Sequence, residues 1–212
     1  MRPFLIILFI FLSCAPKNSA LKNAGYKIYL KTGDVIFRES SKMQHQIFTK
    51  ISGTAINDCG IVEITDENVF VWFVSRNVKR IPIDEWLRLG KTPYFISSRL
   101  SDYNAIIGVK LKLALIRFKG IPEDFKYKWE TKAVYNAEFV RKIYTKVIGT
   151  EITTLESQYI YNKGGSKKEF KNIVTPYQIY TSPFFVEAFN SFPKTVEEPL
   201  EDVVKDSIIS NF

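Results

Sequence analysis

Two side chains decide what chemistry this sequence can perform: Asn136 at the start of an expected helix and Asp58 beside an expected strand. The stretch Ala133–Gly149 places apolar residues at three- and four-residue intervals, which predicts a helix with one buried face. Asn136 is a favoured N-cap residue and Gly149 is typical of a helix end. A thiol at such a helix N-terminus would have a lowered pKa and act as a nucleophile. The carboxamide of asparagine is neither nucleophilic nor titratable near neutral pH.

Three further side chains are weaker candidates for chemistry. Cys59 follows Asp58 in an alternating strand, so it points to the opposite face, and we expect a small buried hydrophobe. Glu138 lies in the first helical turn and could form an acid–base carboxylate pair with Asp58. The alternative is that the helix N-terminus holds Asp58 electrostatically. His45 lies off the apolar positions of an expected helix, and we interpret it as a surface or interface residue.

The composition indicates a folded domain without a metal or a nucleic-acid partner. The chain has 212 residues, of which 46% are hydrophobic and 15% aromatic, enough for one sizeable core. The net charge of +8 is scattered, with no dense block beyond Lys167–Lys168, so we do not expect nucleic acid. Such a charge also suits a protein beside anionic lipid or cell-wall polymer. One histidine and two cysteines give no clustered ligand spacing, so no metal or other cofactor is expected.

Residues 1–14 have the pattern of a lipoprotein signal peptide. One arginine precedes the apolar run Phe4–Leu12, which is too short to span a bilayer. The run continues into Leu-Ser-Cys ending at Cys14, which resembles a lipobox in which the cysteine is lipidated after cleavage. Phe11 departs from the leucine preferred there, and ordinary cleavage nearby is the alternative. We therefore expect a membrane-anchored lipoprotein of the bacterial cell envelope.

The rest of the sequence predicts one α+β domain over residues 26–192. A polar tether, 15–25, precedes it and an acidic tail, 193–212, follows it. Residues 158–166, with two consecutive glycines, are expected to form a polar loop. The runs 59–64, 69–75 and 78–83 predict an antiparallel meander. Further strands are expected at 33–38 and 94–99, and helices at 40–51, 82–87, 102–119 and 133–149, with short helices starting at Thr175-Pro176 and Ser182-Pro183.

An ordered set of short motifs resembles a known family. From residue 33 to residue 189 these are GDVIF, NDCGIV, RIPIDEWLRLG, YFISSRL, IPEDFKYKWE, YNAEFVRKIY and VTPYQIYTSPFFVEAF. Together they resemble the permuted papain-like amidases of the YiiX/YaeF type, which are related to NlpC-type cell-wall cysteine peptidases. The resemblance implies an antiparallel sheet or half-barrel packed against helices. It also implies that the histidine strand precedes the cysteine helix along the chain.

The residues at the catalytic positions of the family differ in this chain. The family motif Tyr-Cys-Ser-Glu corresponds to Tyr135–Glu138, so Asn136 stands at the nucleophile position. Asp58 stands where the strand motif has histidine. The third polar residue, generally a glutamate, falls near Trp72–Phe73, and both of these are apolar. Asn136 and Asp58 are therefore degenerate catalytic positions, and we expect a binding cleft lined by them with Tyr135 and Glu138.

Loss of both nucleophile and base favours a catalytically inactive family member. The family is expected to act on amide or acyl-ester bonds, so we expect the cleft to bind a peptidoglycan peptide or a lipid or acyl ligand. One alternative is an active amidase or peptidase that uses residues outside the family positions. Another is a purely structural envelope lipoprotein whose cleft is filled by aromatic side chains such as Trp72 and Phe73. An open groove between Asp58 and Asn136 would favour binding, and a filled one would favour the structural role.

Overall fold

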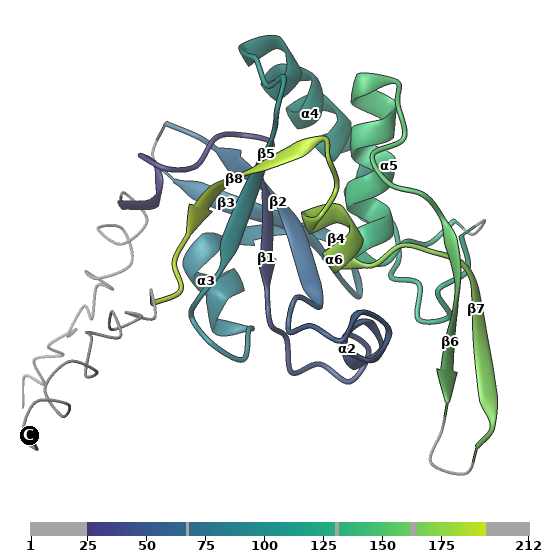
Figure 1. Ribbon diagram of the computed structural model, residues 1–212. Helices are drawn as coiled ribbons and strands as arrows, with labels where there is room; N and C mark the ends of the chain where they lie inside the picture. The colour runs from purple at the N-terminus through teal and green to yellow at the C-terminus, as the bar shows by residue number, and fades with distance from the viewer. Residues whose placement is uncertain (1–24, 67, 130–131, 162–164, 194–212) are drawn as a thin grey trace, which may run out of the picture.

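The computed structural model describes residues 25–66, 68–129, 132–161 and 165–193 (Figure 1). Its centre is a six-stranded antiparallel sheet with the strand order β4-β3-β2-β1-β5-β8. The first strand of the chain therefore lies inside the sheet, between β2 and β5. The strands are β1 (Val35–Arg38), β2 (Asp58–Ile64), β3 (Val69–Ser75), β4 (Asn77–Pro82), β5 (Ile96–Leu100) and β8 (Phe185–Asn190).

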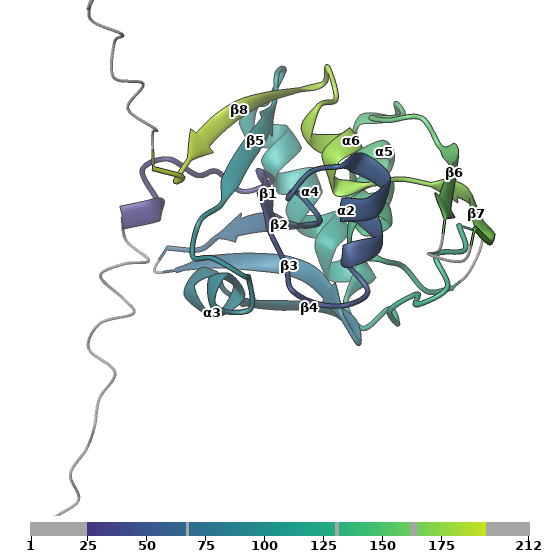
Figure 2. The ribbon, with the colours of Figure 1, turned by 60° about the horizontal axis from the view of Figure 1, so that its bottom comes forward.

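Helices cover both faces of this sheet. Helix α5 packs against β2 and β3, and α4 packs against α5. Helix α3 packs against β3 and β4 on the opposite face, as Figure 2 shows. This arrangement confirms the expected α+β fold with an antiparallel sheet packed against helices. The helices are α2 (Gln46–Ser52), α3 (Ile83–Arg88), α4 (Ala105–Phe118), α5 (Asn136–Ile148) and α6 (Pro176–Tyr180).

The two faces of the sheet bury two separate hydrophobic cores, because successive side chains of a strand point to opposite faces. In β1, Val35 and Phe37 belong to the core beneath α5, whereas Ile36 belongs to the core with α3. The α3 side is closed by Trp86, which is fully buried. This explains why β1 and β2 are apolar on both faces, as strands covered on two sides require.

The meander and the central helix follow the sequence predictions closely. Strands β2, β3 and β4 pair consecutively and antiparallel. Helix α5 ends at Gly149, whose φ of 75° is left-handed, the conformation that favours glycine at a helix end. Helix α4 begins after Asn104, whose side chain accepts a hydrogen bond from the Ile107 N–H.

Three element predictions were wrong. Helix α2 begins at Gln46 instead of near Ser40, because the Ser40 N–H is bound by the Asn57 side chain. The expected polar loop at 158–166 is largely a hairpin of β6 (Glu156–Tyr161) and β7 (Lys167–Ile173), whose backbones pair antiparallel. The helix expected at Ser182-Pro183 is absent there, because the following residues form β8 on the free edge of β5.

Several sequence predictions fall outside the described residues. These are the signal peptide, Cys14, nearly all of the tether and most of the acidic tail. Among the described residues, none of the helices has both the length and the apolar character needed to cross a bilayer.

Candidate functional site

Strand β2 and helix α5 bring Asp58 and Asn136, the two predicted catalytic positions, into direct contact. Asp58 is the first residue of β2, and Asn136 is the first residue of α5. The Asn136 Nδ2 donates a hydrogen bond of 2.6 Å to the Asp58 Oδ1. Asp58 is 0% and Asn136 3% exposed. Their own hydrogen bond therefore occupies the space between them.

Asn136 is the first helical residue and not the N-cap that the sequence predicts; the N-cap is Tyr135. The Asn136 Oδ1 accepts a hydrogen bond of 2.5 Å from the backbone N–H of Val74 in β3. A backbone N–H can only donate, so this contact sets the carboxamide with its Nδ2 toward Asp58. The prediction failed because a strand N–H binds this oxygen in place of a first-turn N–H. Asn136 thus joins α5 to both β2 and β3.

Arg38 balances the charge of Asp58 in this buried cluster. It lies opposite Asp58 in the pairing of β1 with β2, and its Nε and Nη2 donate to Oδ2 at 2.9 and 2.7 Å. Its guanidinium carbon also lies 3.8 Å from the centre of the Trp86 ring, a cation–π contact. Burial would raise the pKa of Asp58, but the Arg38 guanidinium, together with the N–H of His45 that faces the same carboxylate, outweighs burial and holds that pKa below its ordinary value. Asp58 is therefore an ionised carboxylate with fixed partners.

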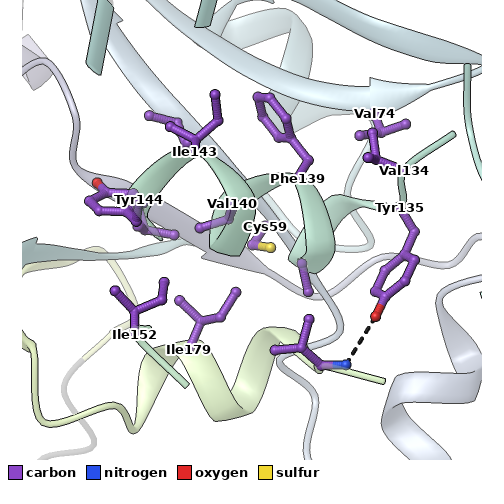
Figure 3. Packing of buried hydrophobic residues seen from close by; sticks show 14 of the residues in the cluster. Cys59, Val74, Val134, Tyr135, Phe139, Val140, Ile143, Tyr144, Ile152 and Ile179 are labelled. Atoms are coloured by element: carbon purple, nitrogen blue, oxygen red, sulfur yellow. Dashed lines mark hydrogen bonds between the residues drawn. The ribbon is translucent and has the colours of Figure 1, made fainter. Parts of the chain in front are cut away.

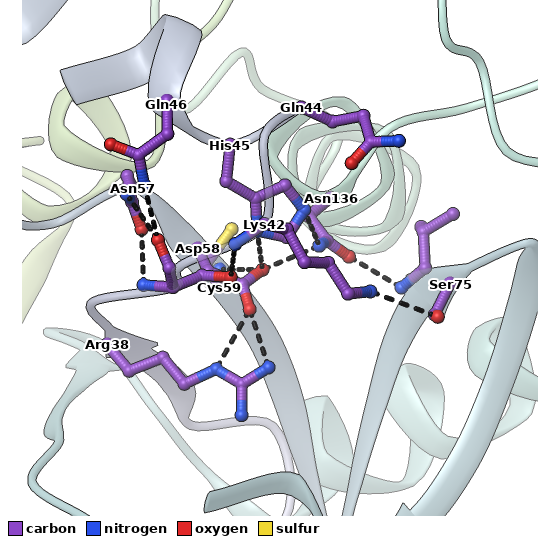
Figure 4. A network of polar contacts seen from close by, with 12 residues as sticks. Arg38, Lys42, Gln44, His45, Gln46, Asn57, Asp58, Cys59, Ser75 and Asn136 are labelled. Carbon is purple, nitrogen blue, oxygen red and sulfur yellow. Dashed lines mark hydrogen bonds and ion pairs between the residues drawn. The ribbon is translucent and has the colours of Figure 1, made fainter. Parts of the chain in front are cut away.

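His45 lies inside the same cluster, so its interpretation as a surface or interface residue was wrong (Figure 4). It is 4% exposed and precedes α2 as its N-cap residue. Its Nε2 is 3.4 Å from the Asn136 Nδ2, and its Nδ1 is 3.6 Å from the Asp58 Oδ1. Because the Asn136 nitrogen is a donor, Nε2 must accept, which places the imidazole proton on Nδ1 facing Asp58. Burial lowers the pKa of His45, with Asp58 opposing it, which favours a neutral ring.

The cluster keeps an imidazole beside a carboxylate but has a carboxamide where a nucleophile would stand. His45 presents one ring nitrogen to Asp58 and the other to Asn136. This is the order acid, imidazole and nucleophile position that activates a serine or cysteine in hydrolases. Covalent catalysis needs a thiol or hydroxyl within hydrogen-bond reach of the base, and Asn136 provides neither. The cluster joins α5 to the sheet, but the side chain of residue 136 has no thiol or hydroxyl that could form an acyl intermediate.

Neither Arg38 nor His45 is recognisable as a member of this cluster from local sequence pattern. Arg38 follows the apolar run of β1, and only its register against Asp58 shows that it enters the interior. Pairing the strand containing GDVIFR with the one containing NDC would have suggested this ion pair. His45 was placed by helical periodicity, but it lies before the helix, where that periodicity does not apply.

Cys59 packs in the core and does not face the cluster as a nucleophile. Its side chain is fully buried in the hydrophobic cluster beneath α5 that includes Val140 (Figure 3). Burial, followed by the charge of Asp58, raises the pKa of this thiol well above its ordinary value. A thiol with a raised pKa is a poor nucleophile. Cys59 therefore behaves as the small buried hydrophobe that the sequence predicts.

Tyr135 and Glu138, the other residues of the expected cleft, are also buried and bound internally. The Tyr135 hydroxyl accepts a hydrogen bond of 2.9 Å from the Val174 N–H. Glu138 Oε2 accepts from the Tyr135 N–H at 3.3 Å, and its Oε1 lies 2.7 Å from the Lys142 ammonium. Burial raises the pKa of Glu138 to about 7, with Lys142 opposing the rise. Asp58 and Glu138 thus have different partners and do not form the carboxylate pair considered above.

Trp72 and Phe73, near which the third polar position of the family was predicted, supply no carboxylate to this cluster. The Trp72 Nε1 donates to Glu63 Oε2 at 2.7 Å, and the same oxygen accepts from Arg80 at 2.9 Å. Phe73 is fully buried in the core on the α3 side of the sheet. Neither Trp72 nor Phe73 lies between Asp58 and Asn136. The hydrogen bond between Asp58 and Asn136 already closes that space. The acid that faces the imidazole is Asp58 instead.

A hollow of about 660 Å³ lies beside this cluster, between β7 and the segment before α5. Tyr127 connects the two, since its ring lies 5.3 Å from that of Tyr135 and its hydroxyl donates to the Gln44 carbonyl. Phe170 forms part of the wall, with the Lys168 ammonium 4.7 Å from its ring centre. The hollow thus combines aromatic surface with positive charge. Its lining residues are Phe125, Lys126, Tyr127, Lys128, Trp129, Lys168, Glu169, Phe170, Lys171 and Asn172.

Metal ligation finds no support in the part of the chain that the structure describes. There, no three or more His, Cys, Asp and Glu side chains are grouped to hold an ion. His45 and Asp58 are neighbours, but the third member of their cluster is a carboxamide that is already hydrogen-bonded.

Comparison with known proteins identifies the family. The model of the permuted papain-like amidase enzymes of the YaeF/YiiX, C92 family matches residues 29–186. The chain belongs to this family. It is 25% identical over 123 residues to the uncharacterized protein YiiX of Escherichia coli K12, an alignment covering 58% of this chain and 61% of that protein. The chain thus aligns with about three fifths of the length of this relative.

The structure also resembles a solved one. The crystal structure described as metalloprotein YiiX from Escherichia coli O157:H7 superposes with a TM-score of 0.67 at 20% identity. The match covers 78% of this chain and 99% of the other. It confirms the fold, and with the family match it confirms the resemblance drawn from the ordered motifs.

Proposed function

We propose that this chain is a catalytically inactive member of the permuted papain-like amidase family, anchored in the bacterial cell envelope as a lipoprotein. One observation carries the proposal. The Asn136 carboxamide occupies the nucleophile position and is hydrogen-bonded to Asp58 and to the Val74 N–H. A residue with both ends of its amide engaged and no thiol or hydroxyl cannot attack an acyl carbon. The raised pKa of buried Cys59 supports the same conclusion.

The ligand proposed for this inactive domain is a cell-wall peptide bearing carboxylates, or an acyl ligand. Asp58 and Asn136 leave no groove between them, so the hollow between the segment 125–129 and β7 is the better binding site. Its lysines Lys126, Lys168 and Lys171 favour an anionic ligand, and its aromatic walls favour apolar groups. Ligand contact is thereby shifted from the degenerate catalytic positions to the segment 125–129 and β7.

A purely structural role is the second candidate, favoured by the same buried cluster. Asp58 and Asn136 join α5 to β1, β2 and β3 through Arg38 and the Val74 N–H. A buried hydrogen-bond network that joins several elements in this way rigidifies a core. A measurement of ligand binding at the hollow distinguishes this structural role from the proposed ligand-binding role.

Turnover and binding assays together test the proposal. Purified protein incubated with peptidoglycan peptides and with acyl esters is expected to release no product and to show no acyl-enzyme burst. Hydrolysis abolished by Cys59→Ala would overturn the proposed inactivity. Binding of a carboxylate-bearing muropeptide is measured by calorimetry, and Lys168→Glu with Lys171→Glu is expected to weaken it. Lys50→Glu, on α2, is the matched control; an absence of binding by the wild type would favour the structural role.

A further inference from the structure

Helix α4 presents an apolar stripe to solvent along the side that faces away from the core. Four large aliphatic side chains form it, and more than half of each is exposed. At about 100° per residue they fall within an arc about 80° wide. The opposite side of the helix is buried and packs against α5. The stripe consists of Ile106 (68% exposed), Val109 (60%), Leu113 (57%) and Ile116 (55%).

Cationic side chains flank this stripe on both sides. Viewed down the helix axis, Arg117 and Lys110 lie about 20° and 40° beyond Ile106, at one edge of the stripe. Lys112 lies beyond Ile116, at the other edge. All three are exposed, and Lys112 approaches Glu63 at 3.5 Å. The 14 residues of α4 include no aspartate or glutamate. A helix with an apolar stripe and cationic borders has the character of a membrane-surface helix.

An anionic bilayer fits this surface better than a second copy of the chain. In a two-fold contact the same patch faces itself, so stripe-to-stripe pairing would bring the lysines and arginine of one helix near those of the other. An anionic lipid surface offers negative charge for the borders and an acyl boundary for the aliphatic side chains at once. Helix α4 lies beside α5 at the periphery of the described fold (Figure 1), and its aliphatic stripe is exposed.

We propose that α4 lies in the headgroup region of an anionic membrane, with its aliphatic stripe inserted and Lys110 and Arg117 on the lipid phosphates. This contact determines which face of the domain rests on the bilayer. It is independent of catalytic inactivity, and it stands whether or not Cys14 is lipidated. A single acyl chain alone gives only marginal binding, so a second membrane contact also strengthens attachment.

A fluorophore on α4 tests the contact directly. In the full chain carrying Cys14→Ser, Leu113→Cys is labelled with an environment-sensitive fluorophore, because the remaining Cys59 is fully buried. Vesicles of phosphatidylcholine with phosphatidylglycerol are expected to blue-shift the emission and make it quenchable by lipid-attached quenchers. Replacement of Lys110 or Arg117 by glutamine, which removes one positive charge, is expected to weaken the response about fivefold for each residue.

The matched control is Leu89→Cys at the end of α3, on the opposite face of the sheet, where Leu89 is 41% exposed. Its emission is expected to stay that of an aqueous label. An unchanged signal at position 113, or an equal response at position 89, would overturn the proposal. So would an equal response with neutral phosphatidylcholine alone. A blue-shift without vesicles that grows with protein concentration would overturn the membrane contact and show that a second copy of the chain covers the stripe.

Discussion

The Asn136 amide nitrogen lies 2.6 Å from the Asp58 carboxylate, so the residues predicted to stand at the nucleophile and histidine positions of the family are hydrogen-bonded to each other. This pair connects helix α5 to the sheet. The carboxamide supplies an acceptor for the Val74 N–H and a donor for Asp58. A cysteine could not make both contacts as well, since sulfur is a weak donor and acceptor.

Replacing Asn136 tests this structural role. Asn136→Ala leaves the Val74 N–H and one Asp58 lone pair buried without partners, so we expect a loss of about 2–4 kcal/mol in unfolding free energy. Asn136→Asp is expected to be at least as damaging, because it places a second carboxylate against Asp58. Urea unfolding measures both, and Asn104→Ala, which removes only the cap of α4, should cost about 1 kcal/mol. A tolerated Asn136→Asp would restore the simple N-cap interpretation.

The ion pair of Arg38 with Asp58 gives a second prediction. Both side chains are 0% exposed, and removing one charge leaves the other buried and uncompensated. Arg38→Met is therefore expected to cost about 3–5 kcal/mol, measured by chemical denaturation. Arg38→Met combined with Asp58→Asn should recover a substantial part of this loss, because neither charge is then left alone. Equal stability of the single and double variants would contradict the assigned pairing.

The sequence predicted the sheet and the main helices because local pattern determines them, but it could not predict the internal contacts of the site. Alternation and turns indicated β2, β3 and β4, and apolar spacing indicated α5. The hairpin of β6 and β7 was missed because its outward residues are polar and its stability depends on cross-strand pairing. His45 joins Asp58 and Asn136 across 13 and 91 residues of chain, a tertiary relationship that periodicity does not encode.

Glu138 predicts a pH dependence of stability. Its folded pKa of about 7 lies above the ordinary value of 4.5, so the folded state binds the proton more tightly than the unfolded state. Its contribution is therefore most favourable below pH 4.5 and is lost as the pH rises through 7. Unfolding free energies of wild type and Glu138→Gln at pH 5 and pH 8 check this. Relative to the wild type, the variant should gain on the order of 1–3 kcal/mol between those pH values. A difference independent of pH would show that this pKa is not raised.

The proposed membrane anchor depends on Cys14, which follows the apolar core of the signal peptide. Cells supplied with a clickable fatty acid are expected to attach it to this protein, and Cys14→Ala should abolish the labelling. Cys59→Ala is the matched control and should remain labelled, because Cys59 is buried inside the domain. A soluble, unlabelled product cleaved within residues 15–20 would instead support ordinary signal cleavage.

The last prediction concerns the imidazole that faces position 136. Restoring a thiol by Asn136→Cys places sulfur beside His45 Nε2 at the start of α5, where the helix dipole and a protonated imidazole both favour thiolate. Asp58→His is not needed for this test, and it would leave Arg38 buried without its carboxylate. We expect the thiolate absorbance of the variant to titrate below the ordinary cysteine pKa of about 8.5.

The wild-type protein is the control for thiolate absorbance in this titration. Its Cys59 has a raised pKa and should stay protonated through the same pH range. His45→Gln in the Asn136→Cys background is expected to return the new thiol toward its ordinary pKa, because glutamine cannot carry the stabilising positive charge. Hydrolysis by Asn136→Cys should stay weak, since the His45 Nδ1 lies 3.6 Å from Asp58, longer than a hydrogen bond that would orient the ring. A thiol that titrates identically with and without His45 would show that the retained imidazole does not act on position 136.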